Sequence, residues 1–301
     1  MATTPPTEKP SLNVGNYCVS FVDLLGQRAA LRGQSLLPPS NSEEEKKKLH
    51  ATLRNSIGSI ASLQERAETM LRASAPNPKS KLRASLSIED QSIWDEMQKT
   101  KVTTQRWSDG LVSFACLGDE EIKCHLNNVY GLFTLAGSLC FMGLASKQPI
   151  RGAIEIAWGV ELHPGEIYGA AVARAYELEN YVAGYPRIVI GPEMLKFLDL
   201  HCQNQKSDAF SQLDRTLATH CKEMILVDAD GHAFLHYLGQ SFFNAVSHGA
   251  HADLYEKAQK FASKQFEEHQ RAQNTKLAFR YLHLLQYFSA HPPPESNAIQ
   301  K

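Results

Sequence analysis

The chain has 301 residues, of which 43% are hydrophobic and 21% charged, and this composition excludes a disordered or fibrous protein. Its 31 Lys and Arg against 32 Asp and Glu give a formal charge of -1, which argues against a dedicated nucleic-acid binder. Six cysteines form no CxxC pair and the N-terminus has no apolar leader segment, so we expect a cytoplasmic protein with free thiols that does not bind a membrane.

The first elements suggest a strand followed by a helical segment. Residues 1–15 are rich in Pro and Thr, and we expect them to be flexible. The run Tyr17-Cys-Val-Ser-Phe-Val22 has the composition of a β-strand and ends at Asp23. Asn41-Ser42 before three glutamates is a helix N-cap signal, and one long helix is expected from there to about Ala73.

A hairpin follows this helical segment. Two apolar strands, 102–107 and 111–116, are separated by Ser108-Asp109-Gly110. An uncharged segment over 127–146 is long enough to cross a bilayer, but its glycines and the strands around it favour a helix buried against a sheet.

The remaining elements alternate in type. We expect a strand over 150–160, a turn at His163-Pro-Gly165, a helix over 170–183 and strands over 187–190 and 224–227, and then helices to the end of the chain. The overall prediction is an α+β fold. Its domain would span 16–240, with a helical insertion at about 40–100 and a helical C-terminal extension over 241–301.

Two acidic residues stand at the ends of these apolar segments. Asp23 ends the first strand, and Asp109 lies in the turn of the hairpin. An Asp at a strand end is most often a turn or cap residue. If the first strand lies beside the hairpin, however, both carboxylates lie at the same end of the sheet. Neighbouring carboxylate oxygens of this kind are the ligands that hard divalent cations require. A third acidic turn, Asp228-Ala-Asp-Gly231, lacks the downstream acidic ligand of a Ca²⁺ loop and is interpreted as a hairpin turn.

The order of these motifs resembles the catalytic domain of class III nucleotidyl cyclases. The resemblance covers 17 to about 195 and consists of F-x-D-L-x-G, the S-D-G turn, Arg151-Gly152 and the segment from Gly169 to Glu179. It implies a ferredoxin-like core with a mostly antiparallel sheet and flanking helices. It also implies a homodimer with composite sites and two Mg²⁺ or Mn²⁺ ions held by Asp23, Asp109 and the Leu24 carbonyl.

The residues that purine cyclases use for the base and the transition state are replaced here. Gln105 and Glu166 stand at the base-reading positions, Ala173 stands where an Asn holds the ribose, and Glu177 stands at the transition-state Arg position. Arg174 is adjacent to that position, although one residue along a helix corresponds to a rotation of about 100 degrees.

These departures, with R-W-S-D-G and I-R-G-A-I, resemble the pyrimidine cyclases of bacterial Pycsar antiphage systems. The resemblance implies conversion of UTP or CTP to a cyclic monophosphate that a separate effector protein reads, and we take UTP as the first candidate. A purine cyclase and an inactive nucleotide-binding or dimerisation module stay as alternatives. Candidate catalytic residues are Asp23, Asp109 and Arg174; candidate substrate-binding residues are Gln105, Trp107, Arg151, Glu166 and Tyr168.

For several of these residues a structural role is the competing interpretation. Arg151 either holds the triphosphate or pairs with an acid at the surface. Tyr168 either stacks on a base or packs before the following helix. Arg106 alternates with Gln105 and Trp107 along a strand, so it should face away from both and serve a structural or interface role.

Overall fold

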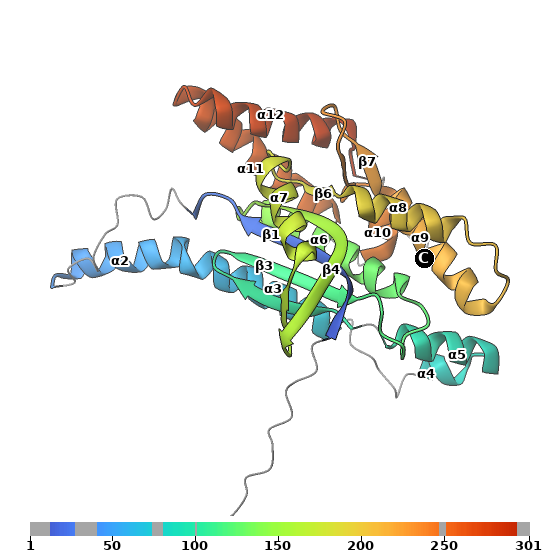
Figure 1. Cartoon of the computed structure of the whole chain (residues 1–301). Coiled ribbons are helices and arrows are strands. Elements are labelled where there is room, and N and C mark those ends of the chain that lie inside the picture. The colour runs from blue at the N-terminus through green and yellow to red at the C-terminus, as the bar shows by residue number, and fades with distance from the viewer. Residues whose placement is uncertain (1–12, 28–40, 74–80, 100, 247–250, 294–301) are drawn as a thin grey trace, which may run out of the picture.

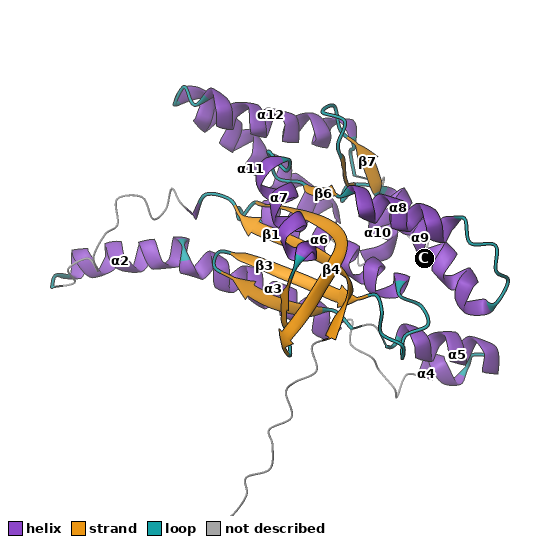
Figure 2. Ribbon diagram, in the orientation of Figure 1, coloured by secondary structure: helices purple, strands orange, loops and turns teal. Residues whose placement is uncertain are grey.

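The computed structural model describes residues 13–27, 41–73, 81–99, 101–246 and 251–293. Its centre is a mixed sheet in which neighbouring strands follow the order β2-β3-β1-β4-β6-β8-β7, with β5 paired to β4 (Figure 1). Helices cover both faces of this sheet (Figure 2). The chain therefore has the α+β architecture that the sequence predicts.

Four antiparallel strands form the core of the sheet. They are β1 (Asn13–Leu24), β2 (Thr103–Trp107), β3 (Gly110–Cys116) and β4 (Ile150–His163). Strand β1 lies between β3 and β4, and β2 pairs only with β3 at the edge. Helices connect β1 to β2 and β3 to β4. This is the strand order and connectivity of a ferredoxin-like fold, as expected.

Alternating residues of β1 point to two different hydrophobic clusters. Cys18, Val22 and Leu24 pack with α6 (Leu126–Ala145), while Val19 and Phe21 pack on the face covered by α7 (Ala170–Tyr181). Period-two alternation with both faces apolar is the pattern of a strand between two helical layers. Asp23 continues the alternation onto the α7 face.

Helix α6 is the main helix beneath the sheet. It is long and apolar enough to span a membrane, but 67% of its most apolar window is buried inside the fold. The second helix on this side, α3 (Ile57–Ala73), packs against α6 through Leu63 and Ala67. The buried helix expected over 127–146 is confirmed.

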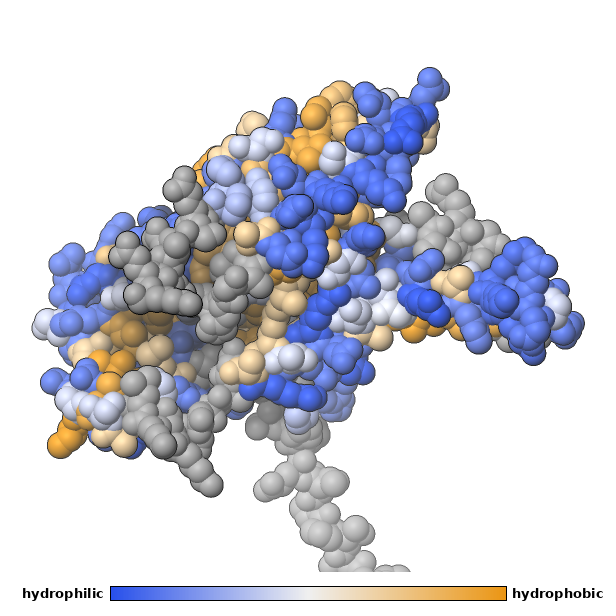
Figure 3. Space-filling model, turned by 180° about the vertical axis from the view of Figure 1, so that it is seen from behind, coloured by the Kyte–Doolittle hydropathy of each residue, from blue (hydrophilic) through white to orange (hydrophobic). Residues whose placement is uncertain are grey.

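The segment over 43–73 differs from the single helix expected there. Ser42 caps α2 (Glu43–Asn55) through a capping box with Glu45, as its sequence predicts. The helix then ends at Ser56, whose hydroxyl donates to the Thr52 carbonyl oxygen at 2.7 Å, and α3 begins at Ile57. Helix α2 has no buried residue and extends away from the sheet, and its surface is largely hydrophilic from behind (Figure 3). Two shorter helices, α4 (Lys81–Ala84) and α5 (Ile88–Met97), complete the insertion.

Short strands extend the sheet beyond β4. They are β5 (Glu166–Tyr168), β6 (Ile188–Ile190), β7 (Ile225–Val227) and β8 (Ala233–Leu235). Strand β6 runs parallel to β4 after the α7 crossover, and the other pairings are antiparallel. Helices α8 (Pro192–Cys202), α9 (Ala209–Glu223) and α10 (Gln240–Val246) fill the connections.

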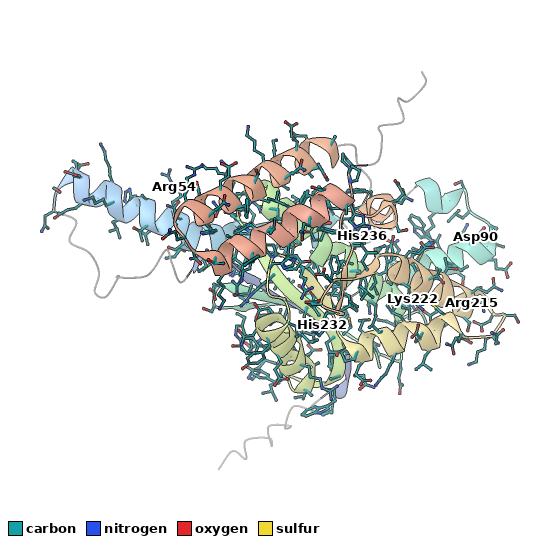
Figure 4. All side chains as sticks on the ribbon, turned by 90° about the horizontal axis from the view of Figure 1, so that it is seen from above. Arg54, Asp90, Arg215, Lys222, His232 and His236 are labelled. Atoms are coloured by element: carbon teal, nitrogen blue, oxygen red, sulfur yellow. The ribbon has the colours of Figure 1, made fainter. Side chains whose placement is uncertain are left out.

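The main part of the C-terminal segment is a helical hairpin. Helices α11 (His251–Arg271) and α12 (Thr275–Ala290) lie side by side, and α11 also packs on α6 (Figure 4). The reversal occurs at Gln273, which has a positive φ of 54°, and Asn274 caps α12. The Tyr287 hydroxyl accepts a hydrogen bond from the Leu238 N–H at 3.1 Å, which fastens α12 to the chain just beyond β8.

Candidate functional site

Asp23 and Asp109 lie at one end of the sheet, on neighbouring strands. Asp23 is paired with Gly110 in the β1–β3 register, and the Leu24 N–H donates to the Asp109 carbonyl oxygen at 3.3 Å. A Cβ atom at Gly110 would lie 2.7 Å from the Val22 carbonyl oxygen, so only glycine lets the turn approach β1 this closely. The expectation that the first strand lies beside the hairpin is therefore confirmed.

A third carboxylate adjoins this pair. Glu179 of α7 is 2% exposed and forms an ion pair with Arg151 of β4, which lies directly opposite Asp23 in the β1–β4 register. Burial raises the pKa of Glu179 to about 7, and the charges of Asp23 and Asp109 raise it while Arg151 opposes the shift. The three acids thus share one electrostatic environment with Arg151.

Arg151 is not the surface residue that one interpretation of the sequence proposed. Its side chain is only 15% exposed and its partner Glu179 is almost fully buried. An arginine held at this position has limited freedom, because burial and the ion pair restrict the guanidinium. The pairing with Glu179 leaves the role of Arg151 toward a triphosphate as a prediction.

The donors around Asp23 and Asp109 suit a hard divalent cation. Both carboxylates are partly exposed, and the Leu24 carbonyl faces the β2–β3 turn because a residue in a strand directs its N–H and C=O to the same side. Within the described part of the chain, no three acidic, His or Cys side chains already have the spacing to hold a metal by themselves. Mg²⁺ and Mn²⁺ complete their shells with water and substrate phosphate, so two carboxylates and a carbonyl fit such ions.

Three of the four candidate base-binding residues lie away from the two aspartates. Gln105 is paired with Val112, further along the hairpin than the Gly110 position beside Asp23. Its side-chain oxygen accepts a hydrogen bond of 3.0 Å from the Ile167 N–H, which joins β2 to β5. Glu166 precedes this contact and is exposed, and Tyr168 follows it and is 41% exposed.

Trp107 belongs to an aromatic row next to the aspartates. Its ring centroid lies 6.3 Å from that of Phe21, which in turn lies 5.5 Å from that of Tyr176 on α7. Trp107 and Tyr176 are 41% and 45% exposed, so the row is accessible from outside the chain. Arg106 faces away from this row and pairs with Glu68 of α3 at 2.9 Å, which confirms the expectation of a structural role.

Arg174 lies on a different side of α7 from Glu179. It is exposed and lines a groove of about 420 Å³ between α7 and α8, together with Glu155, Glu177 and Glu193. Residues five apart on a helix are separated by roughly 140 degrees, so Arg174 does not point to the Asp23 of its own chain. Its catalytic role stays a prediction that requires a second chain.

The acidic turn over 228–231 is structural. The Arg187 side chain, 2% exposed, forms ion pairs with Asp228 through Nη1 and with Asp230 through Nη2. Arg187 Nη2 also donates to the Val182 carbonyl oxygen at 2.7 Å, and the Tyr185 hydroxyl donates to Asp228. Both carboxylates are thus engaged by the fold, which confirms a hairpin turn rather than a Ca²⁺ loop.

Two residues of the site carried no functional prediction. Glu179 closes the motif that begins at Gly169, but its proximity to Arg151 arises only when α7 packs on β4. Arg187 directly precedes β6, and nothing in its local sequence indicates two acidic partners. The sequence did indicate a partner for Glu179, because an acidic residue on an otherwise apolar helix face is rarely buried without one.

Comparisons with known proteins find similarity among solved structures. No family model matches the chain, and no curated protein matches it. Among solved structures, the chain is similar to the adenylyl cyclase CyaB from P. aeruginosa, with 12% identity and a TM-score of 0.35. The match covers 63% of this chain and 83% of that one. A similarity at this level carries no functional argument, so the conclusions below depend on the strand order and side chains of this chain.

Proposed function

We propose that the protein is a metal-dependent nucleotidyl cyclase that acts on a pyrimidine nucleoside triphosphate. The observation that carries the proposal is the meeting of Asp23 and Asp109 at one end of adjacent antiparallel strands, with Arg151 opposite Asp23. This arrangement occurs in a ferredoxin-like sheet, the fold that the motif resemblance implies. Two carboxylates and an arginine at one site suit a substrate that is a polyphosphate complexed with divalent cations.

Cyclisation joins the ribose 3′-oxygen to the α-phosphorus and releases pyrophosphate. Two bound Mn²⁺ or Mg²⁺ ions supply the main chemistry, by lowering the pKa of the 3′-hydroxyl and neutralising the triphosphate. Asp23, Asp109 and the Leu24 carbonyl hold the ions, and Arg151 binds a phosphate oxygen. The chain mainly positions and stabilises charge, as in other phosphoryl transfers.

The distribution of residues favours a site shared between two chains. Gln105, Glu166 and Tyr168 lie along β2 and β5, and Arg174 faces the groove beside α8, so none of them adjoins Asp23 within one chain. In a head-to-tail homodimer these four residues come from the partner. Sedimentation should therefore give a dimer at every concentration at which the protein is fully active, and an active monomer would contradict this assignment.

Two side chains near β5 support pyrimidine recognition. The Gln105 oxygen already accepts the Ile167 N–H, so its amide group is the donor left for a base carbonyl, and an ionised Glu166 only accepts. Trp107 and Tyr168 can occupy the space that the imidazole ring of a purine would need. These hydrogen-bonding groups and the restricted space suit uracil or cytosine. We propose UTP as the first candidate substrate and CTP as the second.

The proposed cellular role follows from the same resemblance. A cyclic pyrimidine nucleotide made in the cytoplasm would act as a second messenger in antiphage defence, read by a separate effector protein. Within the described residues, α11 packs on both α12 and α6, so the C-terminal hairpin is packed onto the sheet domain.

Incubation of the purified chain with each of the four nucleoside triphosphates and Mn²⁺, followed by chromatography, tests the proposal. Cyclic UMP or cyclic CMP is the expected product. Cyclic AMP or cyclic GMP would establish a purine cyclase instead. No cyclic product with any substrate would leave an inactive nucleotide-binding or dimerisation module.

A further inference from the structure

Arg280 on α12 is a half-buried cation without an acidic partner. Within the described residues it takes part in no ion pair or hydrogen bond, unlike Arg151 and Arg187, which are both paired with acids. It lines a cavity of about 240 Å³ whose wall also contains Arg187 and its two acidic partners, Asp228 and Asp230. Because Arg187 already pairs with both aspartates, Arg280 is a partly desolvated guanidinium without an ion pair of its own, which suggests an anion that binds from outside.

The cavity places Arg280 at the end of α7 that carries Glu179. Val182 also lines the cavity and is three residues after Glu179, which is about one helical turn, and Glu179 holds Arg151. His283, one turn after Arg280 on α12, stacks on Tyr185 with ring centroids 6.0 Å apart, and this contact fixes α12 beside the end of α7. The C-terminal hairpin therefore reaches the same end of the sheet as Arg151 and Asp23.

Strand pairing links the cavity to the strand end that carries Arg151. The Gly152 N–H, next to Arg151, donates to the carbonyl oxygen of Arg187 at 2.9 Å, and Arg187 lines the cavity with Arg280. Burial lowers the pKa of Arg280, and the positive charge of Arg151 lowers it in the same direction. The carboxylate of Glu179 is already paired with Arg151, so it does not neutralise Arg280.

We infer that Arg280 and Arg151 together bind the terminal phosphates of the nucleoside triphosphate, so that the C-terminal hairpin forms part of the substrate site. This inference rests on the proposed function. Strand β6 pairs with β4 on the side opposite β1, and Arg187, directly before β6, lines the cavity with Arg280, so Arg280 lies on the side of Arg151 away from the hairpin turn. The metal-bound α-phosphate would lie near the aspartates and the leaving pyrophosphate near the arginines, whose planar groups bind phosphate oxygens in pairs.

Calorimetry of the full chain with inorganic pyrophosphate and Mn²⁺ tests this inference without requiring turnover. Arg280→Gln should weaken pyrophosphate binding by about 10- to 100-fold, the range for a lost hydrogen bond to a charged group. Arg280→Lys should keep only part of the wild-type affinity, because lysine keeps the positive charge but lacks the planar group that binds two phosphate oxygens at once. Lys276→Gln, an exposed cation on the same helix, should change affinity by less than about 2-fold.

Thermal unfolding distinguishes phosphate binding from a structural role. Without ligand, Arg280→Gln should unfold at the wild-type temperature or higher, because it removes the repulsion with Arg151. Pyrophosphate should then raise the unfolding temperature of the variant less than that of the wild type. A lower unfolding temperature with unchanged pyrophosphate affinity would overturn the inference.

The outcomes also separate this inference from the proposed function. If the wild type makes no cyclic nucleotide but Arg280→Gln weakens pyrophosphate binding, the phosphate site stands and the cyclase assignment fails. If the wild type makes cyclic nucleotide and Arg280→Gln binds pyrophosphate as tightly, the inference alone is wrong. Equal losses in Arg280→Gln and Lys276→Gln would show a general charge effect and would also overturn it.

Discussion

Two acidic turns of this chain have similar sequences and opposite surroundings. The turn with Asp109 and Gly110 lies beside Asp23, and Arg151, opposite Asp23, pairs with Glu179. The turn with Asp228 and Asp230 is held by Arg187, which pairs with both of its acids. An acid followed closely by glycine therefore predicts only the turn. The acidic side chains of such a turn serve the fold where another segment supplies a cation that pairs with them.

The largest effect is expected at the first turn. Asp23→Ala and Asp109→Ala should each lower cyclase activity by at least about 100-fold, the scale of losing one electrostatic stabiliser of a transition state. Each variant should keep its fold, because removing one of several neighbouring acids relieves repulsion in the metal-free chain. Product chromatography and circular dichroism measure the two properties, with the exposed Glu120→Ala as the matched control.

Near-normal turnover by either aspartate variant would place the metal site elsewhere. Loss of the fold in both variants would mean that the first turn, like the second, serves stability. Either result would remove the contrast between the two turns.

The second turn should respond in stability rather than chemistry. Arg187→Met leaves Asp228 and Asp230 without their cation, and we expect a loss of about 2–4 kcal/mol of unfolding free energy. The value falls toward the lower end because the Asp230 side chain is 46% exposed. Urea unfolding of Arg187→Met measures the loss, and a change below about 0.5 kcal/mol, the scale of an ordinary surface substitution, would show that the pairing is incidental.

The next prediction concerns how the site distinguishes pyrimidine from purine nucleotides. Trp107→Ala or Tyr168→Ala should raise the use of ATP or GTP relative to UTP by about 10-fold or more, since size filtering is worth roughly 1–3 kcal/mol. Changes at Gln105 or Glu166 should shift the ratio further, because they leave polar groups unmatched. Competition between labelled UTP and ATP measures the ratio, and four unchanged ratios would show that the base site lies on other residues.

A pH dependence of stability is expected at Glu179. Its pKa of about 7 in the folded chain exceeds the ordinary value of 4.5, so between these values the folded state binds a proton that the unfolded state lacks. Stability of the metal-free wild type should therefore fall by up to about 3 kcal/mol, relative to Glu179→Gln, as pH rises from 4.5 to 7. Parallel stability curves for the two proteins would contradict the raised pKa.

Local sequence was sufficient for the elements with strong periodicity. The strand ending at Asp23, the hairpin around Asp109 and the uncharged helix α6 all lie where their patterns placed them. Strand β1 begins earlier than expected, at Asn13, because pairing with β4 continues over residues whose own strand propensity is low. Helix α8 was missed because Gly191 and Pro192 suggest a turn, although Pro is also favoured in the first turn of a helix.

The candidate site was less predictable than the fold. The pairing of Asp23 with Asp109 followed from adjacent strands, whereas the Arg151–Glu179 pair requires α7 to cross β4. Arg280 comes from the other end of the chain, and no local pattern connects it with Arg151. Contacts between distant segments depend on packing, which local periodicity does not encode.

Counting bound Mn²⁺ by electron paramagnetic resonance, with 3′-deoxy-UTP as a substrate that lacks the nucleophile, tests the central claim most directly. The wild type and Asp230→Asn should each bind two Mn²⁺ per chain in the presence of this nucleotide, and Asp109→Asn should lose them. Retention of both ions by Asp109→Asn, or their loss from Asp230→Asn alone, would contradict the assignment of the metal site to the first turn.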